Sequence, residues 1–160
     1  MECPDPQMAS AAKEEILRNI VKTHDVVLIE GWTGTGKTVT TLKAVKGMGD
    51  VYYYDESAGQ SLHCAVQADS KMTVVKNPGD LRDIKPGKQC IIFDDLDHLS
   101  SEVRSILMNM IKAKTEGRKI LVITPVVLDA QDILEYMDAV VRFRRNTAEM
   151  LHSKLYDPGS

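Results

Sequence analysis

The sequence predicts an α/β fold, a three-layer sandwich in which helices cover both faces of a mostly parallel sheet. Short runs rich in valine and isoleucine alternate with longer segments whose apolar residues recur at helical spacing. Such alternation is typical of strand–helix–strand units, whose right-handed crossovers bring successive strands into one parallel sheet. Strands are expected at 26–29, 51–55, 71–76, 90–93, 120–124 and 139–145.

Helices are expected between the strands and at both ends of the chain. Ser10, Ser100 or Ser101, and Asp129 are candidate N-caps, because their side-chain oxygens can accept from the first free N–H groups of a helix. The segment 77–80, Asn-Pro-Gly-Asp, predicts a turn. The expected helical segments are 9–22, 39–46, 57–68, 81–84, 99–114, 129–138 and 147–155.

Composition indicates one globular domain with an ordinary core. The chain has 160 residues, 43% of them hydrophobic and 27% charged, which leaves no room for a second large domain. The formal net charge of -3 offers no general attraction to nucleic acid or an anionic membrane, so nucleic-acid binding stays open and a membrane partner is not expected. Cys3, Cys64 and Cys90 share no metal-ligand spacing and are expected to be reduced thiols.

The sequence predicts neither a membrane span nor an N-terminal signal segment. No segment approaches the roughly 18 apolar residues of a membrane span, and the first residues lack a basic and apolar signal. We therefore expect a cytoplasmic protein with a single domain over 1–160 and short flexible segments at 1–8 and 156–160.

The strongest functional signal is glycine-rich. Residues 31–38 read Gly-Trp-Thr-Gly-Thr-Gly-Lys-Thr and fit the pattern G-x-x-x-x-G-K-[ST] between an expected strand and helix. In that setting backbone N–H groups, a helix N-terminus and an ammonium group converge on one polyphosphate. Lys37 should reach the β- and γ-phosphates, and Thr38 should offer its hydroxyl to Mg²⁺. The expected nucleotide-binding residues are Gly31, Thr33, Gly34, Thr35, Gly36, Lys37, Thr38 and Val39.

Acids and a hydroxyl follow three later strands. Cys-Ile-Ile-Phe at 90–93 is followed by Asp94, the arrangement of a Walker B carboxylate that serves the Mg²⁺ held by Thr38. The strand at 51–55 ends in Asp55 and Glu56, where ligands of open α/β sheets bind. Thr124 ends another strand. It could orient the attacking water or sense the γ-phosphate, and it could equally be a loop entry before proline.

These stretches together resemble the additional-strand group of P-loop ATPases, which adopt the P-loop NTPase fold, and especially its RecA/KaiC-like branch. The resemblance covers most of 25–95 and implies ATP as substrate, Mg²⁺ as cofactor, and a strand between the phosphate-loop strand and the Walker B strand. Carried over by position, Glu56 would polarise the attacking water. The acid after the Walker B aspartate in AAA+ proteins gives a competing assignment to Asp95, and Glu56 is preferred.

Departures from related families favour a minimal core. After the last expected strand only about 15 residues remain, too few for the helical lid of a complete AAA+ module. The segment 129–138 contains no arginine, so an arginine finger would come from a second copy of the chain or from a protein partner. The arginines elsewhere are better explained as salt-bridging or solvated side chains: Arg104, Arg118, Arg142 and Arg144.

Three functions remain in competition. The preferred one is a Mg²⁺-dependent ATPase that drives or regulates a partner or assembly, with turnover that needs an oligomer or partner. The second is an AAA+-like or STAND-like nucleotide switch with little turnover. The third is a small-molecule kinase, because such enzymes place an Asp after the second strand, as Asp55 does here. ATP is expected over GTP because the chain has no N-K-x-D motif.

Overall fold

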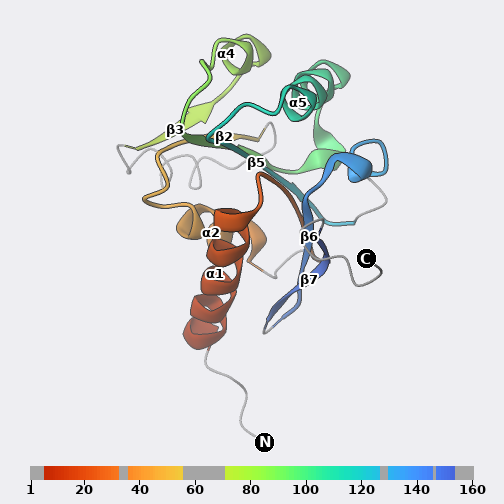
Figure 1. Ribbon diagram of the computed structural model, residues 1–160. Helices are drawn as coiled ribbons and strands as arrows, with labels where there is room; N and C mark the ends of the chain where they lie inside the picture. The colour runs from red at the N-terminus through yellow and green to blue at the C-terminus, as the bar shows by residue number, and fades with distance from the viewer. Residues whose placement is uncertain (1–5, 33–35, 56–70, 127–129, 146, 154–160) are drawn as a thin grey trace, which may run out of the picture.

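Parallel strands form the centre of the molecule (Figure 1). The computed structural model describes residues 6–32, 36–55, 71–126, 130–145 and 147–153. Within these residues one sheet contains β1 (Val26–Glu30), β2 (Asp50–Tyr54), β3 (Met72–Val75), β4 (Gln89–Phe93), β5 (Arg118–Thr124), β6 (Ala139–Phe143) and β7 (Ala148–Ser153). Their order is β3-β2-β4-β5-β1-β6-β7, and every neighbouring pair is parallel except β6 and β7.

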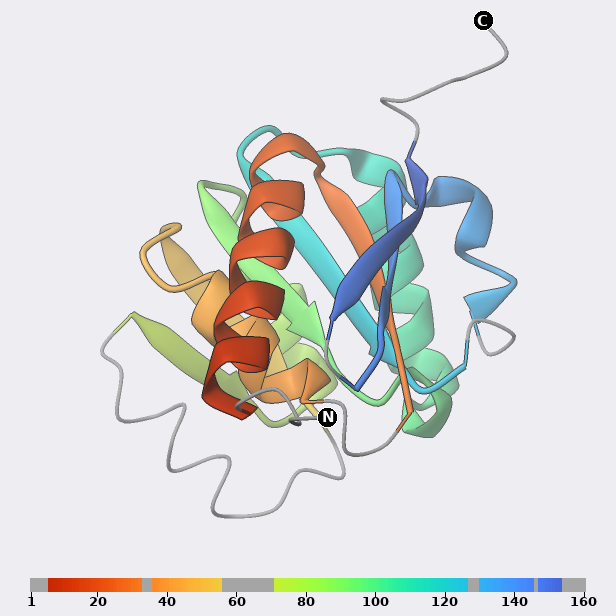
Figure 2. The same ribbon diagram turned by 90° about the horizontal axis from the view of Figure 1, so that it is seen from below.

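Helices form the two outer layers. On one face of the sheet lie α1 (Pro6–Thr23) and α2 (Lys37–Ala44), and on the other lie α4 (Pro78–Arg82) and α5 (Ser101–Ala113), as Figures 1 and 2 show. The short 3₁₀ helices η1 (Leu96–His98) and η3 (Leu134–Tyr136) follow β4 and precede β6. None of the helices in the described residues combines the length and apolar character needed to cross a membrane.

The core consists of two apolar layers separated by the sheet. Leu28 of β1 belongs to the layer under α5, whereas Val27 and Ile29 belong to the layer under α1 and α2. Successive side chains of a strand point to opposite faces, so a strand covered on both faces is apolar at nearly every position. This explains why the continuous apolar runs of the sequence correctly predicted the central strands.

All six expected strands are present, and β5 lies between β1 and β4 in the sheet. Ser100 is confirmed as the N-cap of α5, because its hydroxyl oxygen accepts a hydrogen bond from Val103 N over 3.3 Å. The expected helix at 57–68 lies outside the described residues. Helix α1 begins at Pro6, so Ser10 is a residue of the helix and its prediction as an N-cap was wrong.

The expected helix at 147–155 is wrong, because β7 occupies that region. Arg144 N donates to Thr147 O over 2.8 Å, which reverses the chain, and β7 then pairs with β6 in antiparallel orientation. An unpaired strand edge exposes a row of backbone donors and acceptors, and pairing satisfies them. Tertiary pairing here outweighs the local helical pattern.

Two further expectations are corrected on the α5 side of the sheet. The turn expected at 77–80 is the start of α4, where Asn77 Oδ1 accepts from Asp80 N over 3.0 Å and Pro78 occupies the first turn. No α-helix spans the described part of 129–138. Ala130, Ile133 and Leu134 accept i+3 hydrogen bonds typical of tight turns, and Asp138 N donates to Val26 O, which draws the chain directly into β6.

Candidate active site

A cavity of about 360 Å³ lies at the carboxyl ends of the central strands. Its walls come from the first turn of α2 and from the residues that follow β2, β4 and β5. Parallel strands bring their carboxyl ends to the same edge of the sheet, which is where ligands of open α/β sheets bind. Four segments far apart in the sequence therefore meet around one space.

A second cavity, of about 220 Å³, lies at the opposite edge of the sheet. Its lining includes Arg118, which donates to Gln89 Oε1 over 2.6 Å, and Asp138, which accepts from Val26 N over 3.1 Å. These polar groups hold the fold together at the starts of the strands. Of these two cavities, only the first is lined by predicted site residues in the described part of the chain.

The glycine-rich segment leaves β1 and enters α2 at this cavity. Gly31 N donates to Thr124 O over 3.3 Å, which places the first glycine beside the end of β5. Gly36 has a φ of 77°, a left-handed conformation that favours glycine, and it directly precedes α2. The free N–H groups at the start of α2 therefore face a site suited to an anion. Thr33, Gly34 and Thr35 lie outside the described residues.

Lys37 lines the cavity from the first position of α2. Its ammonium group donates to the carbonyl oxygen of Gly31 and, over 3.2 Å, to that of Trp32. Burial lowers the pKa of Lys37, and the nearby carboxylates of Asp94, Asp95 and Asp97 oppose this shift. The ammonium group thus links the start of α2 to the two residues that follow β1.

The carboxylate of Asp94, at the end of β4, accepts three hydrogen bonds. Its Oδ2 atom accepts from Thr38 Oγ1 over 2.7 Å and from the Tyr53 hydroxyl over 2.6 Å, and its Oδ1 atom accepts from Asp95 N over 2.8 Å. The residue is only 6% exposed. Burial raises the pKa of its carboxyl group, and the bonds from Tyr53 and Thr38 oppose that shift.

Asp94 and Thr38 fit a magnesium site. Mg²⁺ prefers oxygen ligands and is usually held by one or two protein groups together with substrate phosphates. A buried carboxylate and a hydroxyl, in contact with each other at the wall of one cavity, provide that donor set. The structure thus brings together the two residues that sequence analysis assigned to the metal.

Sequence analysis did not assign a role to Tyr53 and left Asp55 outside its set of site residues. The Tyr53 hydroxyl lies 2.6 Å from Asp94 Oδ2 and 3.2 Å from Asp55 Oδ2, and Asp55 lines the same cavity as Asp94. Burial and the charge of Asp94 raise the pKa of the Tyr53 phenol, so that it keeps its proton. The available signal was the alternation of side chains along β2, which separates Tyr53 from its two tyrosine neighbours.

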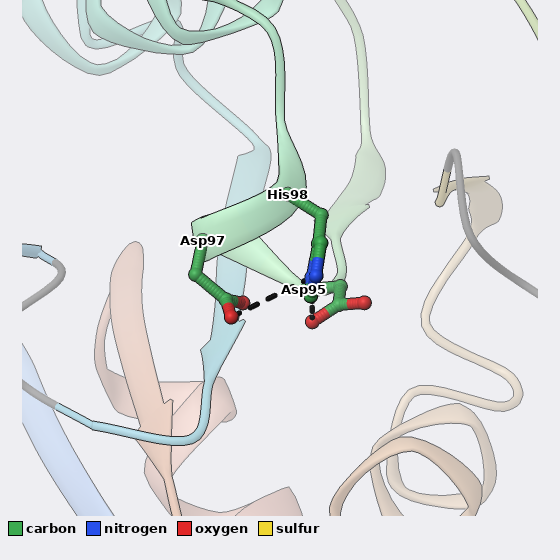
Figure 3. Close-up of side chains that lie close together, drawn as sticks. All are labelled: Asp95, Asp97 and His98. Atoms are coloured by element: carbon green, nitrogen blue, oxygen red, sulfur yellow. Dashed lines mark ion pairs between the residues drawn. The ribbon is translucent and has the colours of Figure 1, made fainter.

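Asp95 also lines the cavity, and its carboxylate contacts a histidine (Figure 3). His98 Nδ1 lies 3.1 Å from Asp95 Oδ1 and 3.5 Å from Asp97 Oδ2. Hydrogen bonding to Asp95 raises the pKa of His98. Asp95 has a φ of 59°, so the chain turns sharply between β4 and η1. The competing candidate for water activation is therefore present at the cavity and is already paired.

Thr124 is fully buried and lines the cavity. A position at the cavity is required if Thr124 orients the attacking water or senses the γ-phosphate. Its hydroxyl donates to Val126 O over 3.1 Å, which also supports the chain after Pro125. Val39 lines the cavity and is half exposed. Glu56, the preferred candidate for water activation, lies outside the described residues.

The four arginines named in the sequence analysis all have partners within the chain. Arg142 pairs with Glu30, and Arg144 Nη2 lies 2.8 Å from Glu149 Oε1. The guanidinium group of Arg104 lies 3.6 Å from Asp132, and that of Arg118 donates to Gln89. These contacts agree with the salt-bridging interpretation for Arg104, Arg142 and Arg144, whereas Arg118 is buried and donates to the neutral side chain of Gln89. Among the described residues that line the cavity, Lys37 is the single basic side chain.

Comparison with known proteins identifies the fold. The sequence matches no family model and no curated protein. The structure is similar to flagellar accessory protein FlaH from Methanocaldococcus jannaschii, with a TM-score of 0.52, 12% identity, and coverage of 82% of this chain and 79% of that one. It is also similar to the Legionella pneumophila ATPase DotB, with a TM-score of 0.50, 14% identity, and coverage of 94% and 51%.

The present chain therefore spans about half the length of DotB. At 12% and 14% identity the likeness concerns the fold alone. The chain has the P-loop NTPase fold, in which the sheet, the flanking helices and the glycine-rich loop occur together.

Proposed function

We propose that this chain binds ATP with Mg²⁺ at the cavity and hydrolyses the bond between the β- and γ-phosphates. The observation that carries the proposal is the 2.7 Å hydrogen bond from Thr38 Oγ1 to Asp94 Oδ2. It joins the glycine-rich motif to the carboxylate that follows β4, two features that P-loop enzymes use around one metal ion. The chain would act as a minimal RecA/KaiC-like ATPase of the additional-strand group, and the position of β5 between β1 and β4 supports that assignment.

The residues of the chain divide the work of binding. The first N–H groups of α2 and the Lys37 ammonium group would hold the β- and γ-phosphates, while Thr38 and Asp94 would hold Mg²⁺. When bound, the metal ion offsets negative charge on the phosphates as the γ-phosphoryl group leaves. Positioning and charge stabilisation dominate phosphoryl transfer, so a rigid set of donors at the strand ends suits the reaction.

Water activation is assigned to Glu56, with Asp95 as the alternative. Asp55, the sequence neighbour of Glu56, lines the cavity, and this supports a role for Glu56 at the same edge of the sheet. A carboxylate next to the attacking water accepts its hydrogen bond and orients it toward the γ-phosphate. Asp95 has a shorter side chain, and its contact with His98 reduces its availability for this role.

Turnover is proposed to need a second chain. Phosphoryl transfer enzymes often gain 10³–10⁵-fold in rate, to an order of magnitude, from an arginine at the γ-phosphate. The cavity as described contains Lys37 as its basic group, and the four arginines considered above contact partners elsewhere. A second copy of the chain or a protein partner would therefore supply the positive charge of an arginine at the γ-phosphate. Hydrolysis would drive or regulate the assembly that this chain forms with that copy or partner.

A nucleotide switch with little turnover is the second candidate. Two observations favour it: Asp95 is paired with His98, and Lys37 is the single basic side chain among the described residues that line the cavity. Both observations imply that this chain alone would accelerate hydrolysis of the bound γ-phosphate only weakly. In this case ATP binding would change the assembly state, and phosphate release would be negligible.

The decisive experiment measures ATP binding and phosphate release with Mg·ATP over a range of protein concentrations. The variants are Lys37→Ala and Glu56→Gln, and the control is Lys43→Ala, which removes an exposed lysine from the same helix. We expect specific activity to rise with protein concentration, to fall in both site variants and to be unchanged in the control. Full turnover by Lys37→Ala would refute the proposal.

The remaining outcomes separate the alternatives. ATP binding without phosphate release, combined with a nucleotide-dependent change in size-exclusion behaviour, would establish the switch. ATP loss that requires an added acceptor hydroxyl would instead identify a small-molecule kinase, with Asp55 at the cavity edge as the group that contacts the acceptor.

A further inference from the structure

Tyr53 is a buried residue of the site whose role no sequence motif explains. Its side chain is fully buried in the core layer under α1 and α2. Its hydroxyl lies 2.6 Å from Asp94 Oδ2 and 3.2 Å from Asp55 Oδ2. A phenol carries one hydrogen, so the shorter distance identifies Asp94 as the main acceptor. Tyr53 thus holds the metal-site carboxylate from the neighbouring strand.

Strand geometry explains why residue 53 reaches this position. Strand β2 pairs with β4, with Tyr53 opposite Ile92 and Tyr54 opposite Phe93. Because side chains alternate between faces, Tyr53 lies on the face covered by α2, whereas Tyr54 packs 6.5 Å from Phe93 on the opposite face. The α2 face is also the one from which Thr38 approaches Asp94.

The donors to Asp94 come from three different parts of the fold. Thr38 belongs to α2, Tyr53 to β2, and Asp95 N to the turn after β4. Thr38 is itself a proposed metal ligand. Tyr53 is therefore the side-chain donor that would influence the metal site through Asp94 alone. Removal of a group that hydrogen-bonds to a metal ligand, without contacting the metal itself, typically lowers metal affinity or activity by about 10–100-fold.

Two negative charges also meet at this point. Asp55 and Asp94 directly follow paired residues of β2 and β4, Tyr54 and Phe93, and the Tyr53 hydroxyl contacts both carboxylates. Neighbouring like charges repel each other, and the hydrogen bond from Tyr53 to Asp94 offsets part of that repulsion. Removing the hydroxyl would leave the Asp94 carboxylate freer to turn away from the cavity.

Building on the function proposed above, we infer that Tyr53 is a positioning residue of the magnesium site. Its phenol hydroxyl holds the Asp94 carboxylate in the orientation required for Mg²⁺ bound together with nucleotide. The residue makes no contact with nucleotide or metal in this role. Its effect therefore appears in the Mg²⁺ dependence of nucleotide binding.

The test compares Tyr53→Phe with Tyr54→Phe, which removes a hydroxyl from the adjacent buried tyrosine on the opposite face. The affinity for a non-hydrolysable ATP analogue is measured in EDTA and over a Mg²⁺ titration, together with the melting temperature of each variant. For Tyr53→Phe we expect the Mg²⁺ concentration at half-maximal effect to rise about tenfold or more, while the EDTA affinity stays within about twofold. Tyr54→Phe should leave both values unchanged.

Each result is decisive. If Tyr53→Phe folds and its Mg²⁺ midpoint is not shifted, the inference is overturned and the proposed function remains intact. The same conclusion follows if Tyr54→Phe shows an equal shift of the midpoint. Absence of analogue binding by the wild-type chain would overturn both. If Tyr53→Phe does not fold, 3-fluorotyrosine at position 53 provides a second measurement. Its ¹⁹F resonance should shift when Mg²⁺ is added to the nucleotide complex, and an unchanged resonance would refute the inference.

Discussion

Thr38 donates its hydroxyl hydrogen to Asp94 Oδ2 over 2.7 Å and so joins the start of α2 to the end of β4. The two residues belong to separate motifs, and their contact lies at the wall of the cavity where we propose that the metal ion binds. Because Asp94 is almost fully buried, the loss of one donor leaves its charge less compensated. This contact is the first target for mutation.

Thr38→Val removes the hydroxyl and keeps the shape of the side chain. We expect it to weaken the Mg²⁺-dependent part of nucleotide affinity by about 10–100-fold, because both the proposed metal ligand and one of the three donors to the Asp94 carboxylate are lost. Thr38→Ser keeps the hydroxyl and serves as the control. Isothermal titration of ATP with and without Mg²⁺ measures the effect, and equal Mg²⁺ enhancement in Val and wild type would contradict it.

Gly36→Ala tests the left-handed turn that begins α2. At a φ of 77° an alanine costs about 1–2 kcal/mol, and relaxation of that strain would displace the N–H groups that face the cavity. We expect lower stability and weaker ATP binding. Gly47→Ala is a matched control, since Gly47 has a φ of 86° and open space around it. It should lose similar stability, measured by denaturant unfolding, with no change in ATP affinity.

Glu56→Gln and Asp95→Asn together determine which acid activates the water. We expect Glu56→Gln to reduce the single-turnover rate by at least about 100-fold, the lower range for a catalytic acid or base, with ATP affinity retained. Asp95→Asn should reduce it much less, because Asp95 is already paired with His98. The reverse order of effects would assign the role to Asp95.

Arg142→Met distinguishes a structural arginine from one that acts in catalysis. Arg142 pairs with Glu30, which is only 7% exposed at the end of β1, so its loss leaves a buried carboxylate without that partner. We expect a lower melting temperature, with the rate of phosphate release per bound nucleotide unchanged. Arg144→Met is the control, because its exposed pair with Glu149 contributes less than about 1 kcal/mol.

Cys90 makes the stability of the folded chain depend on pH in the alkaline range. Burial raises the pKa of its thiol from 9.0 to about 11. Between these values the unfolded chain releases the proton while the folded chain keeps it, so stability falls as pH rises. Below pH 9 this contribution is complete, and the loss by pH 11 is at most about 3 kcal/mol.

Urea unfolding from pH 8 to 11 measures the alkaline loss, with Cys90→Ala as the reference. Tyr53 is present in both proteins, so its own titration cancels in the comparison. The variant will be less stable at all pH values because of the lost packing, but its curve should be flatter. Parallel curves would show that the Cys90 thiol does not keep its proton in the folded chain.

The strands were predictable because their signal is local. A parallel strand buried on both faces is apolar at consecutive positions, and β1, β4 and β5 meet that condition without reference to the rest of the chain. The glycine-rich motif is local for the same reason, since the residues that would surround one phosphate are consecutive. Asp94 was recognisable because it directly follows such a strand.

The errors lie where pairing partners come from distant residues. The C-terminal segment reads locally as helix, yet it forms β7 because β6 offers an open edge. The segment before β6 does not form the expected helix, because Asp138 forms hydrogen bonds with Val26, which is 112 residues away in the sequence. Local patterns contain no information about either neighbour.

By itself, the sequence determined the α/β class and the central strands, and it predicted a glycine-rich phosphate-binding motif and a metal-site carboxylate, because each of these depends on adjacent residues. The tertiary structure alone decided that β5 separates β1 from β4, that Arg142 pairs with Glu30, and that one tyrosine of three reaches Asp94. The physical reason is that strand order, register and the direction of a side chain depend on which surfaces pack together. Those surfaces exist only after the whole chain has folded.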